Sequence, residues 1–274
     1  MTTPEALAAL ATLPGPAHLS LEGKRALVVA AESPVGAAIA RAYAEAGAVH
    51  IALAVLRPDE AVVSAKRLQR ELEGSGATTT VYVMDVTLGR NVQVTTRQIA
   101  KELGGIDIAV CASDLFLGKP IAKTSDSELQ QVMAYNFNAH FFVARSASEE
   151  MRRNDPSGGR LVLVSHVLGE RGLPNTAAYG AAHGATQQLV RSLSQELAPH
   201  GITVNGIATG WMDWMHDRLD ERDDDAGRAV RFTLARRAGT PEDVSPMAVW
   251  LAGSGTGNVT GQVFHIDGGL TQHL

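Results

Sequence analysis

The chain has 274 residues and a formal net charge of −5 at pH 7, a length that fits one α/β domain with a sizeable core. The mild negative charge favours neither nucleic-acid nor membrane binding, and no apolar run reaches the roughly 18 residues that a membrane-spanning helix needs. The single cysteine, Cys111, excludes an intrachain disulfide, and we expect a cytoplasmic location.

The N-terminal residues 1–20 are expected to form an appendage. Residues Pro4 to Leu13 suit one short Ala/Leu helix, which the following Pro-Gly-Pro stops. The segment either packs on a neighbour or is a frayed terminus, and both alternatives stay open. It lacks the basic region of a signal peptide. The folded domain is expected to span residues 21–274.

Continuous apolar runs alternate with longer amphipathic segments through the rest of the chain. The strands predicted from these runs are Arg25–Ala30, Val49–Val55, Thr79–Met84, Ile106–Cys111, Arg160–Ser165, Thr203–Ile207 and Gln262–Ile266. The predicted helices are Pro34–Gly47, Pro58–Leu72, Asn91–Leu103, Ser127–Arg153, Thr176–Ala198 and Pro241–Leu251. This alternation predicts a single Rossmann-type domain, in which a doubly wound parallel sheet lies between two helical layers in a three-layer αβα arrangement.

In such a sheet the ligand crevice lies beyond the carboxyl ends of the strands. Asp85 and Val86 end the third strand, and Asn136 lies in the run Tyr-Asn-Phe-Asn-Ala-His-Phe-Phe. Tyr179 opens a long helix, and the chain closes on a Gly-Gly turn at Gly269. Together, and in one register from about Leu21 onward, these motifs resemble the short-chain dehydrogenase/reductase family, especially its 3-oxoacyl-carrier-protein reductases. The resemblance implies a nicotinamide cofactor, with Tyr179 and Asn136 at the catalytic positions.

The phosphate-binding turn departs from the family pattern. Only Gly36 survives of the glycines expected in the segment Val29–Gly36. Ala30 adds a methyl group, Pro34 removes an N–H, and Glu32 brings a carboxylate to the place where phosphates would lie. Pro34 is equally a good first residue for a helix. We therefore expect pyrophosphate binding to be weakened.

The other cofactor positions differ too. The second strand ends without the acid that binds an adenosine ribose, and Arg57 follows it, either to bind a 2′-phosphate or as a solvated side chain. Cys111-Ala-Ser-Asp114 replaces Asn-Asn-Ala-Gly, and Thr209-Gly replaces Pro-Gly. The candidate cofactor contacts are Gly36, Arg57, Asp85 and Val86. The cofactor is expected to be NADP(H) if one binds, and binding of none is the other alternative.

Two catalytic positions carry histidine. Counting from Tyr179, the family's serine position holds His166, with Ser165 one residue early and facing the other way along a strand. The family's lysine position, four residues after the tyrosine, holds His183 on the same helix face. A neutral imidazole lacks the permanent charge of lysine, so ordinary hydride transfer is expected to be weakened or lost.

The residual set, formed by Tyr179, His183, His166, Asn136 and the less favoured Ser165, suits acid/base chemistry. A lid within residues 210–233 carries aromatic and thioether groups, which indicates a small, fairly apolar carbonyl or hydroxy compound as substrate. No metal site is expected, since two histidines without a third ligand bind metals weakly.

Three functions remain open. The first is a repurposed enzyme with acid/base chemistry of the isomerase, lyase or cyclase type; the second is a divergent NADP(H)-dependent reductase; the third is a non-catalytic subunit of an active relative. In each case the resemblance implies a homo-oligomer, a dimer or tetramer, built on the two long helices near Ser127–Arg153 and Thr176–Ala198. A mixed assembly with another member of the family is the alternative.

Overall fold

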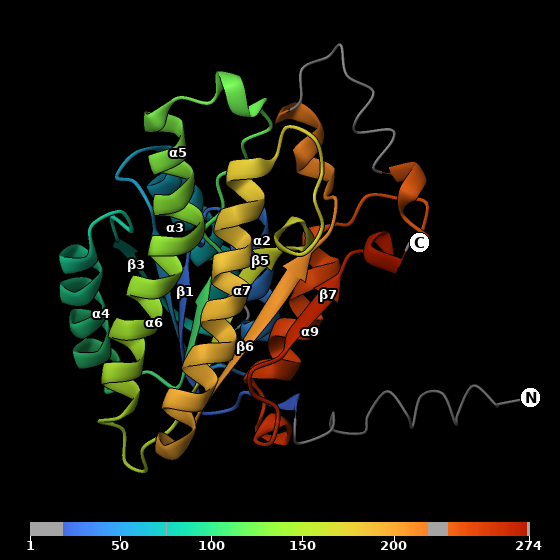
Figure 1. Cartoon of the computed structure of the whole chain (residues 1–274). Helices are drawn as coiled ribbons and strands as arrows, with labels where there is room; N and C mark the ends of the chain where they lie inside the picture. The colour runs from blue at the N-terminus through green and yellow to red at the C-terminus, as the bar shows by residue number, and fades with distance from the viewer. Residues whose placement is uncertain (1–18, 75, 219–229, 273–274) are drawn as a thin grey trace, which may run out of the picture.

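In the computed structural model, which describes residues 19–74, 76–218 and 230–272, seven parallel strands form one sheet in the order β3-β2-β1-β4-β5-β6-β7. The strands are β1 (Arg25–Val29), β2 (His50–Val55), β3 (Thr78–Val83), β4 (Ile108–Cys111), β5 (Gly159–His166), β6 (Ile202–Thr209) and β7 (Val263–Ile266). The predicted Rossmann-type, single-domain, three-layer fold is confirmed (Figure 1).

Helices cover both faces of the sheet because its strands are apolar on both sides. The helices α2 (Pro34–Glu45), α3 (Glu60–Glu73) and α9 (Pro241–Ala252) pack into one core. The helices α4 (Gly89–Leu103), α6 (Ala139–Met151) and α7 (Ala177–Leu197) pack into the other. Figure 1 shows α6 and α7 standing side by side on this second face.

One predicted helix is interrupted. The segment predicted as a single helix over Ser127–Arg153 consists of α5 (Asp126–Met133), a π-helical turn (Ala134–Asn138) and α6. This turn, which adds one residue to the helical path between α5 and α6, is not among the elements predicted from the sequence. The turn carries Asn136, which is buried.

The winding of the sheet positions the crevice. The chain reverses its direction of winding between β1 and β4, so the turns that follow these two strands lie beside each other at the carboxyl edge. Of the predicted appendage, only residues 19 and 20 are described, and much of the predicted lid (219–229) lies outside the described residues. Both boundaries stay predictions.

Candidate active site

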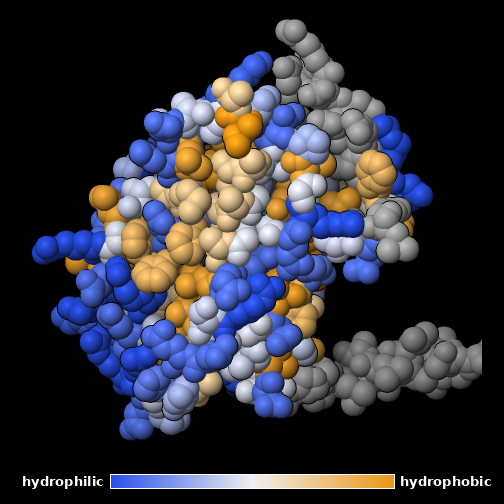
Figure 2. Space-filling model, viewed as in Figure 1, coloured by the Kyte–Doolittle hydropathy of each residue, from blue (hydrophilic) through white to orange (hydrophobic). Residues whose placement is uncertain are grey.

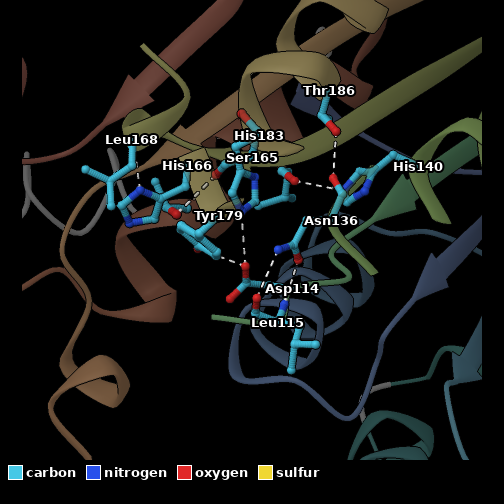
Figure 3. Close-up of polar contacts among 12 residues, drawn as sticks. Asp114, Leu115, Asn136, His140, Ser165, His166, Leu168, Tyr179, His183 and Thr186 are labelled. Atoms are coloured by element: carbon cyan, nitrogen blue, oxygen red, sulfur yellow. Dashed lines mark hydrogen bonds and ion pairs between the residues drawn. The ribbon is translucent and has the colours of Figure 1, made fainter. Parts of the chain in front are cut away.

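Tyr179 and His183 meet a carboxylate that the sequence reading did not single out as a site residue. The Tyr179 hydroxyl donates to Oδ1 of Asp114 at 2.8 Å, and Nε2 of His183 lies 3.3 Å from the same oxygen. The two rings are 4.3 Å apart between centroids, one helical turn apart on α7. Figure 3 shows both side chains converging on Asp114, which lies in the loop after β4.

The charge of Asp114 sets the proton positions in this group. Burial acts to raise the pKa of Asp114, but the hydrogen bonds from His183 and Tyr179 oppose it, and the net pKa is lowered. Asp114 is therefore an ionised acceptor at neutral pH, so His183 donates through Nε2–H. Its side chain is 31% exposed, whereas that of His183 is 2% exposed. Asp114 is thus the member of the group that faces outward.

Asn136 holds the loop that carries Asp114. Its Oδ1 accepts from the Leu115 amide at 2.7 Å, and its Nδ2 donates to the Leu115 carbonyl at 2.9 Å. The Asn136 carbonyl accepts from the Thr186 hydroxyl at 2.6 Å, which ties the π-helical turn to α7. The predicted site residue Asn136 therefore acts here on the backbone next to Asp114.

His166 is placed beside Tyr179, with 5.3 Å between the ring centroids. Its Nδ1 accepts from the Leu168 amide at 3.1 Å, and burial, aided by the charge of His183, lowers its pKa to about 3. His166 is therefore neutral near pH 7 and carries its proton on Nε2, so it is a fixed donor rather than the proton-exchanging group expected from the sequence.

Of these residues, Asp114 and His183 line a small chamber of about 50 Å³. Its lining comes from the turns after β1 and β4, the ends of β5 and β6, α7 and one lid residue: Ser33, Pro34, Val35, Ala112, Asp114, Val164, Ser165, His183, Thr209 and Trp214. Ser165, the less favoured candidate, thus lines the chamber, whereas His166 does not. Ligand pockets usually enclose about 300–1,000 Å³, so the chamber suits only a small group.

In the turn after β1, which corresponds to the family's phosphate-binding turn, a serine of the turn itself occupies the backbone groups. Ala30 takes a left-handed backbone conformation (φ 63°), which a glycine adopts more readily. The Ser33 hydroxyl accepts from the Gly36 amide at 3.0 Å and donates to the Ala30 carbonyl at 2.7 Å. A Cβ on Gly36 would lie 2.1 Å from the Ala30 oxygen, so close packing of helix and turn explains this glycine.

Glu32 turns away from the phosphate position towards the end of β2. Its Oε1 accepts from the Leu56 amide at 3.0 Å, and burial raises its pKa. Arg57 is exposed and donates to the Tyr135 hydroxyl at 3.4 Å. The two side chains therefore lie at the end of β2, and the exposed guanidinium of Arg57 uses one of its donors on Tyr135.

Asp85 and Val86 are built into the turn after β3. Asp85 Oδ1 accepts from the amide and hydroxyl of Thr87, at 2.9 and 2.6 Å. Val86 is 1% exposed and packs in the core of α4 and α6. Both positions thus have structural roles in this chain, and their cofactor contacts stay a prediction.

The missed residue, Asp114, had one signal in the sequence. It occupies the last position of the small-residue loop after the fourth strand, where the family pattern has glycine. Within the described ranges no cluster of three His, Cys, Asp or Glu side chains is arranged to hold a metal. Within the same ranges no helix is long and apolar enough to cross a bilayer.

The parallel sheet has a Rossmann-type topology, and a helix at its carboxyl edge carries Tyr179. These two features are typical of dehydrogenases and reductases. The chain belongs to the short-chain dehydrogenase/reductase family: the family model described as Enoyl-(Acyl carrier protein) reductase matches residues 29–271. The resemblance stated from the motifs is thereby confirmed.

Its relatives cover nearly the whole chain. Gluconate 5-dehydrogenase of Gluconobacter oxydans (strain 621H) is 31% identical over 94% of this chain and 99% of its own length. The 3-oxoacyl-[acyl-carrier-protein] reductase FabG of Rickettsia prowazekii (strain Madrid E) is 28% identical over 92% and 98%. The crystal structure of a gluconate 5-dehydrogenase from Burkholderia cenocepacia J2315 in complex with NADP and tartrate has a TM-score of 0.86 at 26% identity, covering 94% of this chain and 99% of that one.

The residues of this chain do not fit a nicotinamide dinucleotide in the conformation described. The chamber between the turn after β1 and the loop after β4 holds about 50 Å³, room for one or two waters on a share of about 30 Å³ each. At the pyrophosphate end, Pro34 has no N–H, and the Gly36 amide already donates to Ser33. A bound dinucleotide would have to displace these contacts.

A third buried histidine gives the fold a testable pH dependence. His140 in α6 is 0% exposed and donates from Nε2 to the Val164 carbonyl at 2.8 Å. Burial, with the nearby charge of His183, lowers its pKa to about 4. The imidazole is therefore neutral in the folded protein near pH 7.

The free energy of unfolding should decrease as the pH falls from about 6.5 towards 4. In that pH window His140 is protonated in the unfolded chain but stays neutral in the folded chain. The stability that the neutral His140 contributes is therefore complete above about pH 6.5 and is lost on acidification. The variant His140→Gln, which keeps a donor for Val164, should show a shallower slope, by up to about 1.4 kcal/mol per pH unit. Urea unfolding at several pH values measures this, and equal slopes for both proteins would contradict it.

Proposed function

We propose that this chain is an atypical family member that acts on a small, fairly apolar carbonyl or hydroxy compound by acid/base chemistry at Tyr179. The observation that carries the proposal is the Asp114 carboxylate, which accepts from both Tyr179 and His183 at the edge of the small chamber. In this proposal nicotinamide hydride transfer is weakened or lost.

The arrangement has the parts that proton transfer needs. The Tyr179 hydroxyl donates its one proton to Asp114, so it serves a substrate oxygen by turning away from that carboxylate. Asp114 is then the adjacent ionised acceptor that can take a proton from a substrate carbon or hydroxyl. The proton can return from Asp114 to another atom of the same substrate, so the step needs no oxidant or reductant. Enolisation, dehydration and retro-aldol cleavage are of this type.

Removing the phenol tests the proposal directly. Tyr179→Phe should reduce turnover of a responsive substrate, found in a panel of small ketones and hydroxy compounds, by about 10²-fold or more. His183→Ala should also reduce it, because His183 orients Asp114. The matched controls are Tyr135→Phe, whose hydroxyl accepts from Arg57 instead, and His200→Ala, an exposed position after α7. Unchanged turnover in the folded Tyr179→Phe protein would remove this residue from the mechanism.

A cofactor titration tests the second half of the proposal. We expect NADPH and NADH to bind the wild-type chain more weakly than the micromolar range, by fluorescence or calorimetry, since both ends of the crevice are filled by protein groups. The gluconate 5-dehydrogenase from Burkholderia cenocepacia, whose structure contains NADP, is the positive control. Micromolar binding to the wild-type chain would refute the loss of cofactor.

A divergent NADP(H)-dependent reductase is the second candidate. The names of the relatives favour it, since they are dehydrogenases and reductases, and one solved relative is a complex with NADP. In this reading His183 stands for the family's lysine and Arg57 binds the 2′-phosphate. Micromolar NADPH binding with oxidation of NADPH by a ketone would support this candidate.

We also propose that the protein is cytoplasmic, because it has a single cysteine. We propose in addition that it associates with further copies of itself. Figure 2 shows apolar residues gathered over the face of α5 to α7, where Leu129 is 44% and Phe141 is 38% exposed. Burying such a face against a second copy is favourable. Light scattering should therefore give the mass of a dimer or tetramer. A monomer would contradict this, and co-purification with another family member would indicate the non-catalytic subunit instead.

A further inference from the structure

The loop after β4 contributes the outward-facing charge of the chamber. Asp114 occupies the position where the family pattern has glycine, and its side chain projects across the crevice edge to Tyr179 and His183. The side chain of His183 is 2% exposed and lies behind it. Asp114 is therefore the group that a ligand entering along the crevice would meet.

Asp114 has little freedom to move aside. The next residue, Leu115, is held through both its amide and its carbonyl by Asn136, which is fully buried. Two carboxylate hydrogen bonds hold the side chain itself. Opening the crevice here would break the buried hydrogen bonds between Asn136 and Leu115 or separate an ionised carboxylate from its donors, and both changes are unfavourable.

The opposite wall is equally fixed. Ser33 and Pro34 line the chamber from the turn after β1, and the Ser33 hydroxyl is bonded on both sides, to Ala30 and Gly36. The about 50 Å³ between the two walls is too small for a ribose and a nicotinamide ring. An aspartate at a position where the family pattern has glycine fills part of the crevice, on the side where the cofactor would lie.

We infer that Asp114, supported by His183, closes the nicotinamide end of the crevice and so determines which ligands this chain accepts: a small molecule in the chamber, and no dinucleotide. The inference rests on the proposed function and deepens it. On this inference, dinucleotide binding is prevented by Asp114 in the loop after β4 and not by the turn after β1 alone.

Restoring the family residues should restore binding. We expect Asp114→Gly to bind NADPH about tenfold more tightly than wild type, and Asp114→Gly combined with His183→Lys to bind it more tightly still, with fluorescence titration as the measurement. Asp114→Asn keeps the volume and removes the charge, so it should gain less than Asp114→Gly. Glu196→Gln, an exposed charge removal on the same helix as His183, should bind as wild type does.

A gain of affinity separates this role from a merely structural one, because a damaged fold does not create a binding site. Circular dichroism confirms folding, and Asp114→Ala replaces the glycine variant if that variant does not fold. Equal or weaker NADPH binding in the folded Asp114→Gly or Asp114→Ala protein would overturn the inference and leave the proposed function standing. Micromolar binding by the wild type itself would refute both.

Discussion

The crevice depends on the reversal of winding between β1 and β4. Because these neighbouring parallel strands end at the same edge, the turn carrying Ser33 and Pro34 faces the loop carrying Asp114 across a narrow gap. Asp114, Ser165 and His183 reach this gap from the loop after β4, from β5 and from α7. The size of the chamber therefore follows from the side chains on two short turns, on a scaffold shared with the relatives.

Asp114 changes the electrostatic character of this scaffold. A family site with lysine places a cation near the tyrosine, whereas here an ionised carboxylate accepts from the tyrosine hydroxyl. A carboxylate in partly buried surroundings needs donors, and Tyr179 and His183 supply them. The aspartate and the histidine are thus physically linked replacements, since an unpaired carboxylate would be costly at this place.

The proposed chemistry and the family membership are compatible. The fold supplies a tyrosine hydroxyl at the carboxyl edge of a parallel sheet, which can serve proton transfer with or without hydride transfer. The relatives named above are dehydrogenases and reductases by name. Three departures from the family motifs, at positions 114, 166 and 183, lie next to the Tyr179 ring or hydroxyl.

Sequence by itself determined the fold class and most elements, because apolar periodicity and the spacing of the motifs around Tyr179 depend on local order along the chain. It also placed histidines at positions 166 and 183. Only the tertiary structure decided what those positions do: His166 is held neutral by burial and a backbone bond, and Glu32 reaches the end of another strand. The partnership of Asp114 with Tyr179 and His183, 65 and 69 residues away, arises from packing across the sheet edge, which no local pattern encodes.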